Sequence, residues 1–270
     1  MRKIVGISQK IKRAWLDVML DHFAHTTDER EIRAFLDQQL RFELPGTESR
    51  AKASGILLRI WISVERQHLG LRNRAVDFIP RVSAQERIWL HWGMTALAYP
   101  FFRDVAETVG RLLALQEDFT TTQVQARMLT AWGDRTTTRE AVQKLITSLL
   151  DWGVLRSTKH GHFFLAEKLM SGVPDLQLWL LEALLRASAA DEIEAHQLLR
   201  LPESFPFKFT ATLGELRRSE CFNIYRQGVD MDMVAARRSA IESMANSSRK
   251  QRHPKNSDNG DTEQPDLFGT

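Results

Sequence analysis

The succession of hydrophobic periodicities between residues 101 and 170 constrains the fold of this chain more than any other feature. Apolar residues recur at helical spacing over 101–115, over 123–132, and from 136 to Trp152. A polar break over 116–122 separates the first two helices, and Phe119 within it is expected to pair as a short strand. Two strand-like runs, 154–158 and 162–165, then flank Lys159-His160-Gly161, where Gly permits a tight turn. This order predicts a helix-turn-helix with an appended β-hairpin.

The third of these helices has an apolar side that can anchor it and a polar side that is free to meet a partner. The apolar stripe consists of Val142, Leu145, Ile146 and Leu149. Gly133, in the preceding turn, suits the left-handed conformation that ends a helix. Thr136 or Thr137 is expected to cap the start, and Glu140, three residues after Thr137, would complete a capping box.

The polar side chains of this helix and of the hairpin are the candidate contacts to duplex DNA. They are Thr136, Thr138, Arg139, Gln143, Lys144 and Thr147 on the helix, and Arg156, Lys159 and His160 on the hairpin. Arg139 and Gln143 lie four residues apart near the helix start, and in a major groove Arg can read guanine and Gln adenine. Lys144, the threonine hydroxyls and the hairpin tip suit phosphate contacts. Glu140 opposes this interpretation, because its carboxylate repels phosphate.

The segment from 101 to 170 resembles the winged-helix DNA-binding superfamily in the order of its elements. The resemblance covers about 70 of the 270 residues and rests on the pattern, without a diagnostic short motif. It implies that the third helix enters the major groove and that the hairpin lies along the backbone. Winged helices also serve as protein-docking modules, so a protein partner is the alternative.

The flanking segments predict a mainly α-helical chain in four parts. Residues 1–99 read as an N-terminal helical unit, with four helices over 8–99 and capping boxes at Thr26–Glu29 and Ser83–Glu86. This unit is expected to pack beside the winged helix of 100–170, and to dock protein partners or a second copy. Residues 171–245 predict helices followed by a small α+β unit, with strand-like alternation at Phe207 and Phe209. The polar segment 246–270 is expected to be disordered.

The last residues contain Gln264-Pro265-Asp266-Leu267-Phe268. This pentapeptide resembles the motif by which bacterial replication and repair proteins bind the sliding clamp. The resemblance implies that Gln264 hydrogen-bonds in a small polar pocket and that Leu267 and Phe268 enter an apolar one. Pro265 departs from the motif, which more often has an aliphatic residue there. Chance, or docking of the tail on the protein's own surface, is the alternative.

Composition and motifs argue against several functional classes. The formal net charge is only +3, so a basic face must come from local clustering. Cys221 is the single cysteine, which precludes an intramolecular disulfide and fits the cytoplasm. The apolar stretches are too short or too interrupted for a signal peptide or a membrane span. His22 and His25 share a helix face but lack further ligands at metal spacing. We therefore expect no catalytic residue, metal or cofactor, although scattered nuclease carboxylates would leave no motif.

These observations predict a cytoplasmic, non-enzymatic DNA-binding protein. In helix order and size, the chain is also similar to the small winged-helix accessory proteins of bacterial phage-exclusion operons, which implies a role in antiviral defence. A transcriptional repressor is the nearest alternative, and it would dimerise on a palindromic site. A protein-protein adaptor that uses the winged helix for docking is the alternative from another class.

Overall fold

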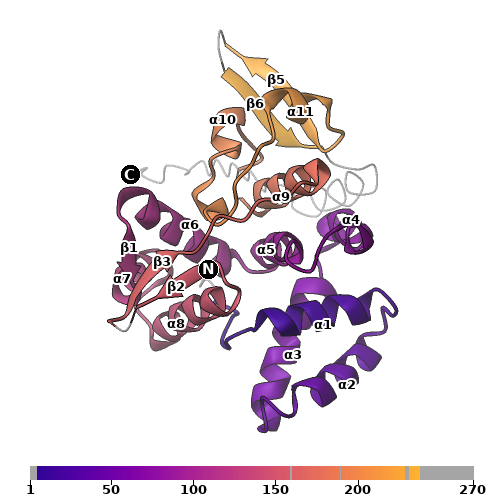
Figure 1. Ribbon diagram of the computed structural model, residues 1–270, viewed down its shortest axis with the longest axis vertical. Helices are drawn as coiled ribbons and strands as arrows, with labels where there is room; N and C mark the ends of the chain where they lie inside the picture. The colour runs from indigo at the N-terminus through magenta and orange to yellow at the C-terminus, as the bar shows by residue number, and fades with distance from the viewer. Residues whose placement is uncertain (1–4, 159, 189, 229–230, 238–270) are drawn as a thin grey trace, which may run out of the picture. The chain divides into compact units, whose positions relative to one another are not determined.

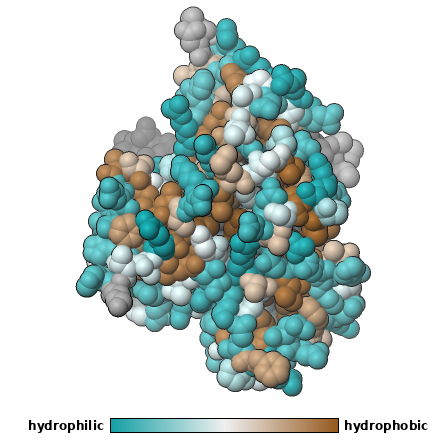
Figure 2. Space-filling view, viewed as in Figure 1, coloured by the Kyte–Doolittle hydropathy of each residue, from teal (hydrophilic) through white to brown (hydrophobic). Residues whose placement is uncertain are grey.

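The computed structural model describes residues 5–158, 160–188, 190–228 and 231–237 (Figure 1). It is mainly helical, with two three-stranded antiparallel sheets, which confirms the predicted mainly α fold with a small α+β unit. On the face drawn in Figure 2, patches of hydrophobic residues interrupt a largely hydrophilic surface. Within the described ranges, every helix is too short or too polar to cross a membrane.

The N-terminal part contains one more helix than the four predicted. Its helices are α1 (Arg13–Phe23), α2 (Glu29–Leu40), α3 (Thr47–Trp61), α4 (Leu69–Asp77) and α5 (Arg87–Ala98), with 3-10 turns at Arg66–His68 and Ile79–Arg81. The reciprocal bonds of the predicted Ser83–Glu86 capping box form, since each side chain accepts from the other's backbone N–H. They lie in the turn before α5, whose N-cap residue Glu86 makes no side-chain cap. The Thr26–Glu29 box is wrong, since Asp28 caps α2 instead.

Helix α5 lies at the centre of the core and packs against α9 (Pro174–Ala187). The two helices approach closely at Gly93, where an added Cβ would lie 2.8 Å from the Trp179 ring. Trp92 of α5 contacts the rings of Phe102, Trp152, Phe205 and Phe207. Buried apolar residues form one continuous cluster from Ile7 to Phe207, so the predicted units 1–99 and 100–170 share a core.

Residues 100–158 and 160–170, which we call the central module, have the predicted order of elements. They are α6 (Pro100–Leu115), β1 (Asp118–Thr120), α7 (Thr121–Trp132), α8 (Thr136–Asp151), β2 (Leu155–Ser157) and β3 (His162–Leu165). The strand order is β1-β3-β2, with Phe119 opposite Phe163. Gly133 and Gly161 have φ of 91° and 75°, as their turns require. The predicted threonine cap of α8 is wrong, because Arg135 precedes the helix and makes no side-chain cap.

The C-terminal part forms a small sheet beside a second apolar cluster. Its elements after α9 are β4 (Glu192–Glu194), α10 (Ala195–Leu198), the 3-10 turn η3 (Pro202–Ser204), α11 (Leu213–Arg218), β5 (Phe222–Gln227) and β6 (Met231–Ala236). The strand order is β4-β6-β5. The strand expected at Phe207 and Phe209 does not form among the described residues, where only one isolated β-bridge joins Phe207 to Leu169. Both phenylalanine rings pack on Trp89 instead. The predicted disordered tail lies outside the described residues.

Candidate nucleic-acid interface

Helix α8 is buried on one side and exposed on the other. Val142, Leu145, Ile146 and Leu149 are each at most 2% exposed, as their shared stripe predicts. The opposite side presents Arg139, Glu140, Gln143 and Lys144, all exposed. The first three turns of α8 therefore display two cations, one amide and one carboxylate to solvent.

The last turn of α8 is held by the extended segment 5–12, which we call the N-terminal strap (Figure 1). The backbone N–H of Ile11 donates to Ser148 Oγ at 2.9 Å, and Trp152 Nε1 donates to the Ile11 carbonyl at 3.0 Å. Asp151 accepts from the Arg13 N–H at 2.8 Å and pairs with Lys10 at 3.1 Å. The strap thus fixes α8 at its C-terminal end and leaves its N-terminal turns uncovered by these contacts.

Arg139 is held by a neighbouring carboxylate. Its Nη2 lies 2.8 Å from Asp134 Oδ1, in the turn before α8, and both side chains are largely exposed. The Arg139 carbonyl accepts from Gln125 Nε2 of α7 at 3.0 Å, which ties the two helices together. An exposed ion pair of this kind is weak, so a stronger acceptor can displace Asp134.

The three predicted threonines of α8 have different environments. Thr138 is fully buried, and its Oγ1 donates to the Gly133 carbonyl at 3.1 Å. It therefore ties the turn to the helix and offers no atom to DNA, which removes it from the candidate contacts. Thr147 is half-buried and donates to the Gln143 carbonyl at 2.8 Å. Thr136 is exposed at the helix start.

The hairpin carries two of its three predicted contacts within the described residues. Arg156 of β2 is exposed, and its guanidinium carbon lies 5.4 Å from the centroid of the Phe164 ring. His160 is exposed in the turn. Lys159 lies outside the described residues. His162, in β3, faces Asp118 of β1, with Nδ1 and Oδ2 3.1 Å apart.

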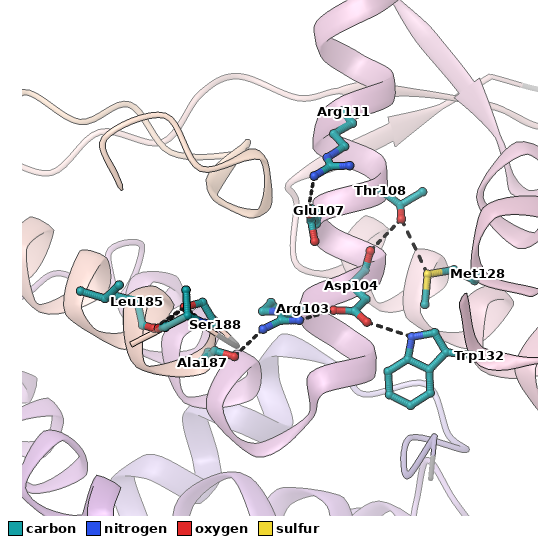
Figure 3. Close-up of polar contacts among 11 residues, drawn as sticks. Arg103, Asp104, Glu107, Thr108, Arg111, Met128, Trp132, Leu185, Ala187 and Ser188 are labelled. Carbon is teal, nitrogen blue, oxygen red and sulfur yellow. Dashed lines mark hydrogen bonds and ion pairs between the residues drawn. The ribbon is translucent and has the colours of Figure 1, made fainter. Parts of the chain in front are cut away.

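A polar network links α6 to the end of α7 and the turn that precedes α8, and Figure 3 shows its part around Asp104. The sequence pattern did not predict this network. Asp104 of α6 accepts from the Arg103 guanidinium at 2.6 Å through Oδ1, and from Trp132 Nε1 at 2.9 Å through Oδ2. The Trp132 carbonyl in turn accepts from Arg135 Nη2 at 2.7 Å. Asp104 and Trp132 are 28 residues apart, a separation that helical periodicity does not connect.

The charge of the central module is nearly balanced. Residues 100–170 contain nine Lys and Arg against eight Asp and Glu, so their formal net charge is only +1 with His neutral. Specific hydrogen bonds and local cations, rather than net charge, must then carry any contact with a polyanion.

The metal candidate of the N-terminal part has an aromatic partner. His22 stacks on Phe35, with ring centroids 3.9 Å apart. In the described part of the chain, no group of three or more His, Cys, Asp or Glu residues is placed to hold a metal ion. In comparisons with known proteins, no family model, curated protein or solved structure matches this chain.

Proposed function

We propose that this protein is a non-enzymatic, cytoplasmic DNA-binding protein that places the first turns of α8 in the major groove of duplex DNA. One observation carries the proposal. The core buries the apolar side of α8 and the strap binds its C-terminal end, while Arg139, Gln143 and Lys144 face solvent. A helix held in this way can enter a groove without unfolding its support. The N-terminal residues of a recognition helix are the ones that reach base edges.

The proposal gives the side chains separate tasks. Arg139 and Gln143, one helical turn apart, reach base edges, since their side chains can each make paired hydrogen bonds to one base. Lys144, Thr136 and Thr147 contact phosphates. Arg156, Lys159 and His160 place the hairpin along the backbone.

Titration of the full chain with duplex DNA at several salt concentrations tests the proposal. Affinity is expected to fall with salt at a log-log slope of about −0.9 for each phosphate neutralised. Lys144→Gln should weaken binding to all sequences and lower the slope by about one. Arg139→Gln should instead relax the preference found by selection from a random duplex library. Arg30→Gln, which removes an exposed cation from α2, serves as the control. Absent binding at low salt, or equal losses in all three variants, would contradict the proposal.

A protein-docking role for the same face is the rival, and Glu140 is the observation that favours it. Its exposed carboxylate stands between Arg139 and Gln143 and would face the phosphates of a bound duplex. Recovery of a partner that survives nuclease and high salt, and that is lost in Arg139→Gln, would support the adaptor. The N-terminal helices are the proposed site for protein partners or a second copy.

Within DNA binding, two biological roles remain proposals. Dimerisation on a palindromic duplex would favour a transcriptional repressor, because two-fold protein symmetry matches two half-sites. Co-purification with large ATPase or methylase subunits would favour an accessory subunit of a phage-defence system.

A sliding clamp is the proposed partner of Gln264, Leu267 and Phe268, which lie outside the described residues. Their sequence supports this, since two apolar residues follow a polar segment that can act as a tether. Titration of the full chain against a purified clamp, beside a Leu267→Ala/Phe268→Ala variant, tests the idea. Equal behaviour of the two chains would count against it.

A further inference from the structure

A cavity of about 720 Å³ lies between α6 and the segment that follows α9. Its walls include Arg103, Glu107 and Arg111 of α6, and His196, Arg200 and Glu203 from the segment after α9. The volume is in the range of small-molecule sites. Ile193, Leu201 and Pro202 supply apolar wall, so the cavity can hold an organic group as well as a charge.

The basic side chains of this cavity keep hydrogen-bond donors free for a ligand. The Arg103 side chain is 17% exposed and is fixed from behind, where Asp104 Oδ1 accepts from Nε and Nη2 and the Ala187 carbonyl accepts from Nη1 (Figure 3). These bonds use three of its five N–H groups, which leaves two for a ligand. Arg200 and His196 are exposed, and neither forms an ion pair with a described residue.

Two of the three acids in the cavity wall are offset in part by their surroundings. Glu107 is paired with Arg111 at 2.5 Å. Glu203 is 5% exposed, and burial raises the pKa of its carboxyl, which favours the uncharged form. Glu194 is the remaining acid of the wall. The balance therefore favours an incoming negative charge over a positive one.

We propose that this cavity binds a small organic oxyanion, a carboxylate or a phosphate ester. Arg103, which its other hydrogen bonds hold in place, donates to the anion from the cavity wall, and Arg200 and His196 donate from the rim. The apolar part of the wall contacts the rest of the ligand. Guanidinium groups suit this chemistry, because their paired N–H groups match the oxygen pairs of carboxylates and phosphates.

The cavity is connected to the start of α8. Arg103 shares Asp104 with Trp132, and the Trp132 carbonyl accepts from Arg135, the residue that precedes α8. A ligand that accepts hydrogen bonds from the Arg103 guanidinium would weaken the hydrogen bonds between Arg103 and Asp104. The Asp104–Trp132 bond, and with it the position of the 133–135 turn, would then change. Regulation of DNA binding by the ligand rests on the proposed function, whereas ligand binding itself does not.

The indole N–H of Trp132 gives a direct readout of the site in the full-length protein. Its ¹H–¹⁵N resonance, assigned from the spectrum of Trp132→Phe, is followed during titration with inorganic phosphate and, separately, with citrate. Chloride at matched ionic strength is the control. A saturable shift with either anion is expected, and the more effective anion identifies the phosphate or carboxylate class.

Arg200→Gln should weaken that binding by about tenfold or more, because it removes a charged hydrogen-bond donor. Arg30→Gln should leave it unchanged. No saturable shift with either anion, or an equal shift in Arg200→Gln, overturns the proposed site.

DNA titrations with and without the effective anion, at constant ionic strength, test the connection to α8. A change in affinity that Arg200→Gln abolishes supports regulation, and an unchanged affinity overturns it. If no DNA binds under any condition, the proposed function fails, while the Trp132 resonance still decides whether the cavity binds an anion.

Discussion

The backbone N–H of Ile11 donates to the hydroxyl of Ser148 across 137 residues of sequence, at 2.9 Å. The Ser148 hydroxyl in turn donates to the Lys144 carbonyl at 3.0 Å, so one buried hydroxyl joins the N-terminal strap to α8. Trp152 completes the attachment through its bond to the Ile11 carbonyl. These hydrogen bonds therefore attach the C-terminal end of α8 to the N-terminal part of the chain.

Ser148→Ala is expected to destabilise the protein by about 1–3 kcal/mol, because it leaves the buried Ile11 N–H without its acceptor. Urea unfolding measures the change. Thr147→Ala is the matched control, since its hydroxyl bonds only within α8 among the described contacts, and its effect should stay within about 0.5 kcal/mol. If the two variants unfold alike, the strap does not support α8.

Asp134→Asn is expected to raise DNA affinity a few-fold, because it releases Arg139 from its ion pair and removes a charge that opposes phosphate. Binding of a fixed duplex at low salt measures the gain. Glu140→Gln removes a neighbouring carboxylate that forms no ion pair with Arg139, and it separates the two causes. Equal gains would show that only the lost negative charge matters. No gain in either variant would argue that α8 does not approach DNA.

Local patterns predicted the central module well. Phe119 pairs as a short strand, and Gly161 turns the hairpin. Each depends on residues close in sequence, where periodicity and a glycine carry the information. The burial of Thr138 could also have been predicted from the sequence, because Thr138 lies at helical spacing on the same stripe as Val142, Leu145 and Leu149, which the helix buries.

Local sequence patterns did not predict the long-range packing. The alternation at Phe207 and Phe209 is typical of a strand, but the two rings instead cover Trp89 from an irregular segment. The Ser148 attachment and the Arg103 cavity join residues about 100 or more apart, which no local pattern relates. DNA contact, the clamp motif and the domain boundaries stay predictions.

Gly110 and Gly55 are both inside helices but should respond oppositely to alanine. A Cβ at Gly110 of α6 would lie 1.9 Å from the Pro202 carbonyl oxygen, so η3 would have to move, at an expected cost of about 1–3 kcal/mol or more. A Cβ at Gly55 of α3 meets nothing within 4 Å, so Gly55→Ala should stabilise by about 0.5–1 kcal/mol. Thermal and urea unfolding measure both. A harmless Gly110→Ala would mean that α6 and η3 are not in close contact.

Glu203 should make the protein less stable as pH rises. Burial is the largest cause and raises the pKa of its carboxyl, and the charge of Glu107 also raises it, whereas a hydrogen bond from its own backbone and the charges of Arg103 and Arg111 act in the opposite direction. The folded chain then holds a proton that the unfolded chain releases near the ordinary pKa of Glu, about 4.3, so the contribution of Glu203 to stability is fully present below that pH. This contribution is lost as pH rises through the higher pKa of the folded state. Glu203→Gln removes this loss, so the variant should match the wild type in acid and exceed it near neutrality.

Urea unfolding of Glu203→Gln at a series of pH values between 4 and 7 measures the difference from wild type. Glu215→Gln is a control of opposite sign, because the backbone N–H of Thr212 lowers the pKa of Glu215, so the wild-type carboxylate adds stability above its ordinary pKa. Relative to wild type, Glu203→Gln should therefore gain stability with rising pH while Glu215→Gln loses it. Parallel curves for Glu203→Gln and wild type would mean that Glu203 ionises as freely in the folded protein as in the unfolded chain, and the cavity beside Arg103 would then hold one more negative charge.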